Sequence, residues 1–118
     1  MTSYAEPVLT YLTWHMRAFP VRCYDEVDEE QRSLRHVAFD EDLDIYVAAA
    51  SLAETLHARD TGGLDGVVAY EHLYGPAPEG PVPTLHDGAE TISAATFEEM
   101  WLLGRSARET DWDTKPRS

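Results

Sequence analysis

The first regular apolar pattern in the chain follows Pro7. Apolar residues then recur at every third or fourth position as far as Phe19, and Pro20 comes directly after them. This spacing is that of one face of an amphipathic helix. Proline is favoured in the first turn of a helix and stops one that has already begun. The pattern therefore predicts a helix over residues 7–19.

A second, broader apolar stripe predicts the central helix of the core. Apolar residues spaced three or four apart run from Ile45 to Leu56, as on the buried face of a helix. Asp40 precedes them and belongs to the residue types that cap helix N-termini. The glycines of "DTGG" at 60–63 can take the left-handed conformation that closes a helix. We expect a helix over residues 41–59.

Two short strands are expected after this helix. "GVVAYEHLY" at 66–74 is rich in β-forming residues. "GPAPEGPVP" at 75–83 has four prolines and two glycines, a composition typical of an irregular loop. Residues 82–86 are β-forming again, so the two strands are expected to pair as a hairpin.

The remaining elements are helical. Thr96 and Glu99 have the spacing of a capping box, which predicts a helix that begins there. A short helix over 26–35 is also expected. The chain is thus predicted to be one α+β domain over residues 1–108, dominated by three to four helices with a short β-hairpin, and a polar C-terminal tail over 109–118. An all-α fold is the alternative if the hairpin is a loop.

Charge narrows the functional classes. The 118 residues carry a formal net charge of −13, with a pI near 4.5. Such a field repels nucleic acids and anionic membranes and attracts basic proteins. We therefore expect no direct nucleic-acid binding and no membrane association. Cys23 is the single cysteine, which excludes an intrachain disulfide and favours a reducing compartment. Without a basic leader or a long apolar run, the sequence indicates a cytoplasmic protein.

No metal or cofactor site is predicted. Residues 40–44 begin with the D-x-D-x-D spacing of a calcium loop. That loop requires glycine at its sixth position and glutamate at its twelfth, where this chain has Ile45 and Ser51. The histidines show neither HxH nor HxxxH spacing, and no glycine-rich phosphate loop occurs.

An enzyme is the weaker alternative. Cys23 precedes an acidic run that raises a thiol pKa and so disfavours a nucleophile. If 66–74 and 82–86 form a hairpin, His72 and His86 share a face beside Tyr70 or Glu71, and a histidine so placed can serve as a general base. This arrangement would suit a small enzyme or a small-molecule binder.

The acidic segment 25–44 favours a binding role. It holds nine carboxylates and two arginines. We expect an inhibitor or adaptor whose acidic face contacts a basic protein, one that itself binds nucleic acid being the natural candidate. Inhibitors of phage-defence nucleases, immunity proteins and antitoxins share this size and charge. A solvated face without a partner, salt adaptation and an accessory subunit are the alternatives, and the oligomeric state stays open. The expected partner-binding residues are Asp25, Glu26, Asp28, Glu29, Glu30, Asp40, Glu41, Asp44 and Trp112.

Overall fold

The computed structural model describes residues 8–78 and 80–114, with side chains as far as Thr110. Its elements are β1 (Thr10–His15), β2 (Val21–Val27), β3 (Ser33–Asp40), β4 (Ile45–Ser51), α1 (Leu52–Tyr74), the short 3-10 helix η1 (Leu85–Asp87), β5 (Glu90–Thr91) and α2 (Ala94–Thr114). The strands form one antiparallel sheet in the order β4-β3-β2-β1-β5.

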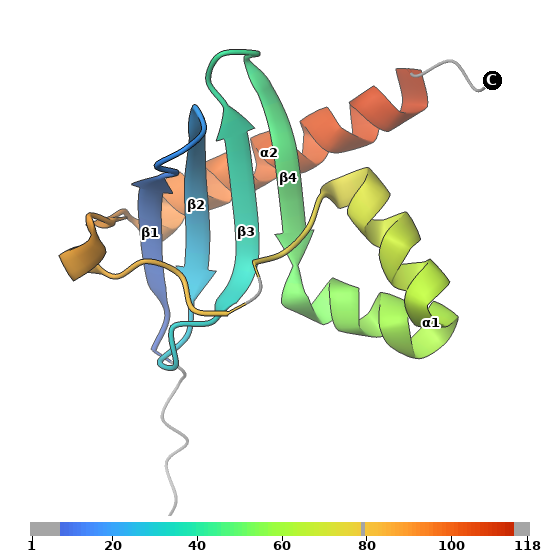
Figure 1. Ribbon diagram of the computed structural model, residues 1–118, viewed down its shortest axis with the longest axis horizontal. Coiled ribbons are helices and arrows are strands. Elements are labelled where there is room, and N and C mark those ends of the chain that lie inside the picture. The colour runs from blue at the N-terminus through green and yellow to red at the C-terminus, as the bar shows by residue number, and fades with distance from the viewer. Residues whose placement is uncertain (1–7, 79, 115–118) are drawn as a thin grey trace, which may run out of the picture.

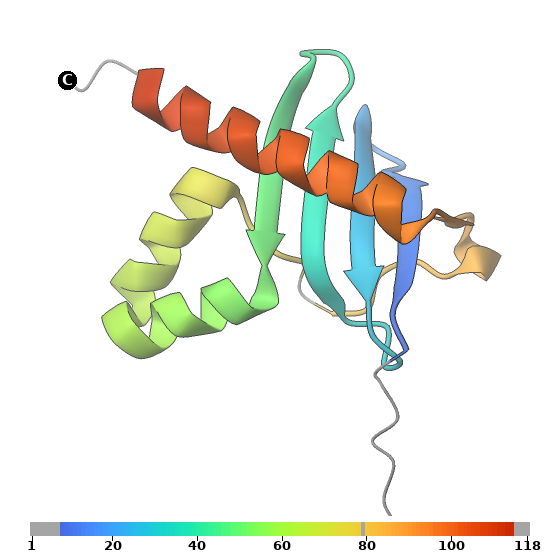
Figure 2. The same ribbon diagram turned by 180° about the vertical axis from the view of Figure 1, so that it is seen from behind.

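The sheet has two differently covered faces. Helix α2 crosses one of them, which we call the helix face (Figure 2). Residues 75–78 and 80–84 run across part of the opposite face, which we call the loop face (Figure 1). Helix α1 projects beyond the β4 edge, and none of its residues is buried. The buried core therefore lies on the two faces of the sheet.

Small residues bring α2 close to the helix face. A Cβ atom on Gly104 would lie 3.2 Å from Ala49 Cβ and 3.2 Å from Val37 Cγ1. Phe97 is fully buried there, and its ring centroid lies 5.4 Å from that of Tyr11. On the loop face, Leu12, Val27, Val82 and Ala89 form one buried cluster, and Val21, Cys23, Ala38 and Ala48 form another.

The predicted helix over 7–19 is wrong, because residues 10–15 form β1. The apolar residues of this stretch fit a period of two as well as one of 3.6. Leu12 and Trp14 face the loop side of the sheet, whereas Tyr11 faces α2. Threonine and aromatic residues also favour strands. Pairing with β2 therefore makes this stretch a strand, although its spacing had predicted a helix.

The predicted helix over 41–59 is wrong in its first half. Residues 41–44 form a turn, residues 45–51 form β4, and only from Leu52 is the chain helical. The alanines at 48–50 favour helices in isolation, but here they are fully or almost fully buried between the two covering layers. The expected short helix over 26–35 is also wrong, because β2, a turn and β3 occupy that segment.

The predicted hairpin does not form. Residues 66–74 are the second half of α1, and 82–86 contain part of η1. Gly62 or Gly63 was predicted to end a helix; Gly63 has φ 62 and kinks α1 instead of ending it. Gly75 then ends α1 with φ 78, and a Cβ atom there would lie 2.5 Å from the carbonyl oxygen of Val47. Glycine is needed at this close approach.

The predicted C-terminal helix is confirmed, with a different cap. The side-chain oxygen of Ser93, three residues before the predicted cap, accepts a bond from the Thr96 backbone N–H at 3.0 Å. Helix α2 continues past residue 109, where a tail was expected, to Thr114. Residues 115–118 lie outside the described part of the chain.

The fold is a small α+β domain, as predicted. Within the described residues, five strands and two long helices replace the expected three to four helices and short hairpin, and the two helices still hold more residues than the five strands. The all-α alternative is wrong.

Candidate functional site

The structure divides the acidic segment 25–44 among three places. Asp25 and Glu26 lie within β2 and are buried. Asp28, Glu29 and Glu30 lie in or beside the β2–β3 turn. Asp40 ends β3, and residues 41–44 form the β3–β4 turn at the other end of the sheet (Figure 1). The nine carboxylates therefore do not form one continuous face.

Asp25 is the centre of a buried polar cluster on the loop face. Its side chain is fully buried, and it accepts bonds from Trp14 Nε1 at 2.7 Å and Ser33 Oγ at 2.6 Å. His36 Nδ1 lies 2.8 Å from Asp25 Oδ1. These partners satisfy the carboxylate inside the protein. Asp25 is not accessible to a partner, contrary to its expected role, because strand alternation turns it inward.

Glu26 faces the opposite layer and joins the sheet to α2. Its two carboxylate oxygens accept bonds from Arg35 Nε at 3.0 Å and Arg35 Nη2 at 2.8 Å. The same guanidinium also binds Glu98 of α2, and its central carbon lies 4.9 Å from the centroid of the Phe97 ring. Glu26 is 8% exposed, so it stabilises the packing of α2 and offers little surface to a partner.

The β2–β3 turn carries the next three carboxylates. Asp28 Oδ1 accepts the backbone N–H groups of Glu30 and Arg32, each at 2.9 Å, and its other oxygen binds the Arg32 side chain. Bonds from these backbone groups, above all Arg32, lower the pKa of Asp28. Asp28 therefore shapes the turn, while Glu29 and Glu30 are exposed.

The β3–β4 turn is built in a similar way. Asp40 Oδ1 accepts the backbone N–H groups of Asp42 at 3.0 Å and Leu43 at 2.9 Å. Asp44 has φ 57, in the left-handed region where aspartate is tolerated better than most residues. The turn is therefore held in one shape by its own hydrogen bonds.

Two contacts tie this turn to the β1–β2 turn. The Glu41 backbone N–H donates to the Pro20 carbonyl oxygen at 2.8 Å. His15 Nε2 lies 2.6 Å from Glu41 Oε1, and its Nδ1 lies 2.8 Å from the Met16 carbonyl oxygen. Both ring nitrogens thus lie within hydrogen-bond distance of oxygen atoms, one on each turn.

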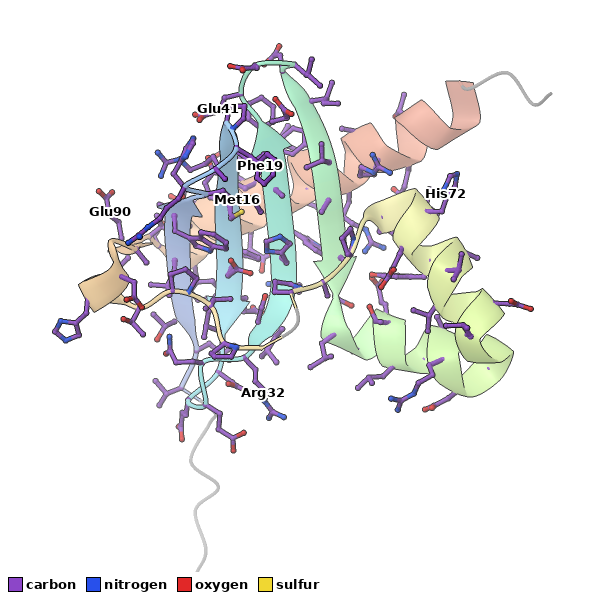
Figure 3. All side chains as sticks on the ribbon, viewed as in Figure 1. Met16, Phe19, Arg32, Glu41, His72 and Glu90 are labelled. Atoms are coloured by element: carbon purple, nitrogen blue, oxygen red, sulfur yellow. The ribbon has the colours of Figure 1, made fainter. Side chains whose placement is uncertain are left out.

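The joined turns present apolar and acidic side chains together. Phe19 is 64% exposed, Leu43 66% and Ile45 46%. Figure 3 shows Phe19 and Glu41 at the same end of the sheet. We call this group the acidic rim, and it consists of Phe19, Glu41, Asp42, Leu43, Asp44 and Ile45. Exposed apolar residues that gather in one patch mark a protein contact, whereas scattered ones, such as Leu64 and Leu102 here, are common on protein surfaces.

The hairpin histidines do not meet. His72 lies on α1 beyond the β4 edge, and His86 lies in η1, which precedes β5 at the other edge of the sheet. Figure 3 shows His72 and Glu90 of β5 at these opposite edges. The predicted shared face is wrong, because the hairpin that would have created it does not form.

Cys23 was not expected to be a nucleophile, and Trp112 was expected to bind a partner. Burial raises the pKa of the Cys23 thiol to about 12, and nearby Asp25 adds to the shift, so the thiol is held protonated. Trp112 lies in the last turns of α2, where its side chain is outside the described part of the structure.

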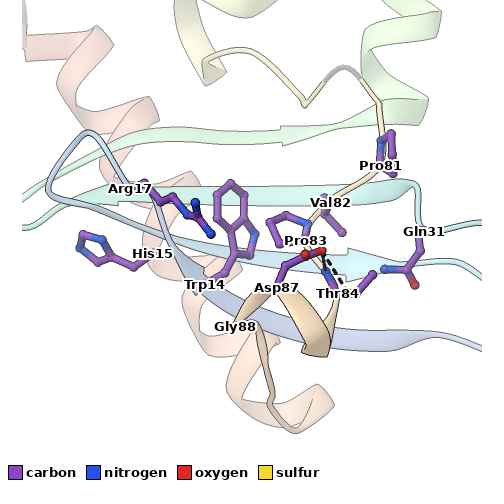
Figure 4. A pocket seen from close by; sticks show the side chains of 10 residues that line it. All are labelled: Trp14, His15, Arg17, Gln31, Pro81, Val82, Pro83, Thr84, Asp87 and Gly88. Carbon is purple, nitrogen blue, oxygen red and sulfur yellow. Dashed lines mark hydrogen bonds between the residues drawn. The ribbon is translucent and has the colours of Figure 1, made fainter.

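A cavity of about 520 Å³ opens between β1 and the segment 81–88 (Figure 4). Trp14 and Val82 line its apolar part, while Arg17 and Asp87 supply opposite charges. The Asp87 carboxylate accepts bonds from the Thr84 backbone N–H at 3.1 Å and hydroxyl at 3.0 Å. Sequence reasoning missed this site, because residues 14–17 were assigned to a helix and 82–86 to a strand.

No protein-family model, no curated protein and no solved structure matches this chain. Within the described residues, neither long helix is apolar enough to cross a membrane. In the same part of the chain, no three His, Cys, Asp or Glu side chains gather as metal ligands would.

Proposed function

We propose that the protein acts by binding a basic protein partner through the acidic rim. The observation that carries this proposal is the exposure of Phe19, Leu43 and Ile45 beside carboxylates, on two turns that are tied together. Apolar anchors surrounded by charge supply affinity at the centre of an interface and selectivity at its border.

The distribution of cations supports an acidic outer surface. Arg35 and Arg105 bind carboxylates at the joint between α2 and the rest of the fold, and Arg108 donates to the carbonyl oxygens of Leu73, His72 and Tyr46. No lysine or arginine occurs between residues 36 and 58. Three arginines are thus used to hold the fold together, and the segment that supplies the rim carboxylates contains no cation of its own.

The proposed partner is a protein with a basic surface of the kind that binds phosphate backbones. Carboxylates can occupy positions where phosphates would lie, which makes the protein an inhibitor or adaptor. Electrostatic attraction of this kind mainly accelerates association and makes it salt-dependent. Burial of the apolar anchors mainly slows dissociation.

Two charge-matched variants test the rim. Asp42→Asn with Asp44→Asn removes two charges from the rim, and asparagine tolerates the positive φ of position 44. Glu29→Gln with Glu30→Gln removes two exposed charges at the other end of the sheet. Each variant is used in a pull-down from cells of the source organism, and the captured basic protein is then purified for association kinetics across a salt series.

The rim variant is expected to associate about tenfold more slowly at low salt, with a flatter salt dependence, whereas the control changes little. Leu43→Ser is expected to accelerate dissociation. If both charge variants slow association equally, the net charge and not the rim governs binding. Capture without any salt dependence would also contradict the proposal.

A further inference from the structure

The cavity beside β1 has the size of a small-molecule site. Its volume of about 520 Å³ falls within the range of roughly 300–1,000 Å³ that is usual for ligand pockets. Trp14 of β1 and Pro81, Val82 and Pro83 of the loop line it (Figure 4). Val82 is buried, and its backbone N–H donates to the Gln31 carbonyl oxygen at 3.2 Å. The apolar wall formed by the loop is therefore anchored to the sheet.

The Trp14 ring is fixed without any ligand. Its Nε1–H donates to the buried Asp25 carboxylate at 2.7 Å, which Ser33 and His36 hold in turn. A buried carboxylate is costly to desolvate. Its bond to Trp14 gives it a role outside the core, because the bond orients an aromatic ring that lines the cavity. An aromatic wall fixed in advance lowers the entropic cost of binding.

Arg17 differs from most arginines of this acidic protein. Among the described arginines, Arg17 and Arg22 make neither a hydrogen bond nor an ion pair, while the others bind carboxylates or carbonyl oxygens. Only Arg17 of this pair lines the cavity. Figure 4 shows its guanidinium beside the Trp14 ring. A guanidinium presents several donors that suit a carboxylate.

Asp87 supplies the opposite charge. Bonds from Thr84, the backbone N–H first, lower the pKa of Asp87, so its carboxylate is charged at neutral pH. Both of these bonds go to Oδ2. Within the described residues no hydrogen bond is made to Oδ1, and Asp87 lines the cavity.

We propose that this cavity binds a small zwitterion, specifically a free amino acid with an apolar side chain. The ligand carboxylate pairs with Arg17, the ammonium group pairs with Asp87, and the side chain packs against Trp14 and the proline-rich wall. A purely anionic ligand would meet Asp87 unfavourably, and a purely cationic one would meet Arg17. Opposite charges at an apolar cavity are complementary to one molecule that carries both.

The test is a titration of the full chain with L-phenylalanine and L-leucine, followed by NMR of the tryptophan indole N–H groups. The chain has three tryptophans, and the Trp14 signal is assigned with Trp14→Phe. Saturable movement of this signal at millimolar ligand is expected. N-acetyl-L-phenylalanine and L-phenylalaninamide, which lack one charge each, are expected to bind at least about tenfold more weakly.

Matched variants test which residues pair with the two charges of the ligand. Arg17→Gln should weaken the binding of L-phenylalanine about tenfold or more. Arg22→Gln, which changes the other arginine without a partner, should leave this binding unchanged. Asp87→Asn keeps an oxygen that can accept the bonds from Thr84. It should weaken the binding of the free amino acid but not of the N-acetyl form, because the N-acetyl form has no ammonium group. Absence of any saturable shift, or equal binding of all three phenylalanine derivatives, would overturn the proposal. Equal loss in both arginine variants would overturn it as well.

Discussion

Asp25 and Glu26 are neighbours in the sequence and buried in different layers of the protein. Asp25 faces the loop side of the sheet and is bound by the indole of Trp14, the hydroxyl of Ser33 and the imidazole of His36. Glu26 faces α2 and is bound by the guanidinium of Arg35. One buried carboxylate has no arginine or lysine partner, and the other has a bidentate ion pair.

The difference shows that burial alone does not define what a carboxylate does. A carboxylate that is bound by several groups with one donor each can orient those side chains, as Asp25 orients Trp14 at the cavity. A guanidinium that also reaches Glu98 on another element connects layers, as Arg35 connects β3 to α2. The Asp25 cluster thus organises a site, and the Glu26 pair secures the fold.

The largest effect is expected from Asp25→Ala. The substitution leaves the donors of Trp14, Ser33 and His36 without their acceptor in a fully buried position, so the free energy of unfolding should fall by about 3–5 kcal/mol. Urea unfolding at neutral pH measures it. Asp25→Asn, which keeps the shape and one acceptor oxygen, should cost about half as much. A loss below about 1 kcal/mol for Asp25→Ala would show that the cluster is not a structural centre.

A smaller effect is expected from Arg35→Ala. It leaves Glu26 buried without its ion pair and removes the contacts with Phe97 and Trp101, so a loss of about 2–3 kcal/mol is expected. The loss is smaller than for Asp25→Ala because the Arg35 side chain is 21% exposed. Arg35→Lys keeps the charge but not the bidentate geometry, and it should recover only part of the stability. Full recovery would mean that charge alone matters here.

The smallest effect concerns Glu98 and pH. The bond from Arg35 is the main cause of the lowered pKa of Glu98. A lowered pKa in the folded state gives stability that is present above the ordinary value of 4.5 and is lost as the pH falls through the folded pKa. Because Glu98 is half exposed, its share is about 0.5 kcal/mol.

Between about pH 6 and pH 3, the free energy of unfolding should therefore fall slightly more steeply with decreasing pH in the wild type than in Glu98→Gln. The substitution leaves the Asp25 cluster unchanged, so the cluster contributes equally to both pH profiles. Identical pH profiles would show that the link between Arg35 and Glu98 adds nothing to stability.

Several local signals in the sequence were right, although they belonged to other elements. Asp40 was expected to cap a helix, and it does accept the backbone N–H groups two and three residues later, but in a turn between strands. Gly63 was expected to take a positive φ, and it does so at a kink. Side-chain caps and glycine conformations are local properties, and they do not specify which element follows.

The candidate site was predictable only in part. Glu41 and Asp44 were among the expected binding residues, and they lie on the exposed rim. Asp25 and Glu26 looked equivalent to them in the sequence, yet strand alternation buried both. Phe19 was assigned to a helix face, so its exposure beside Leu43 could not be foreseen. The cavity combines residues of two segments about 70 positions apart, and that contact depends on the order of the strands.

The sequence by itself determined the C-terminal helix, the irregular proline-rich segment and the strongly acidic character of the protein, whereas the α+β class was predicted from a hairpin that does not form. The first three follow from composition and from interactions between residues close in the chain. Only the tertiary structure decided that residues 10–15 and 45–51 are strands, that the acidic segment is divided among three places, and that Trp14 and Asp87 line the same cavity. The physical reason is that strand pairing and burial depend on residues distant in the chain, and their free energies exceed the small local preferences that the sequence displays.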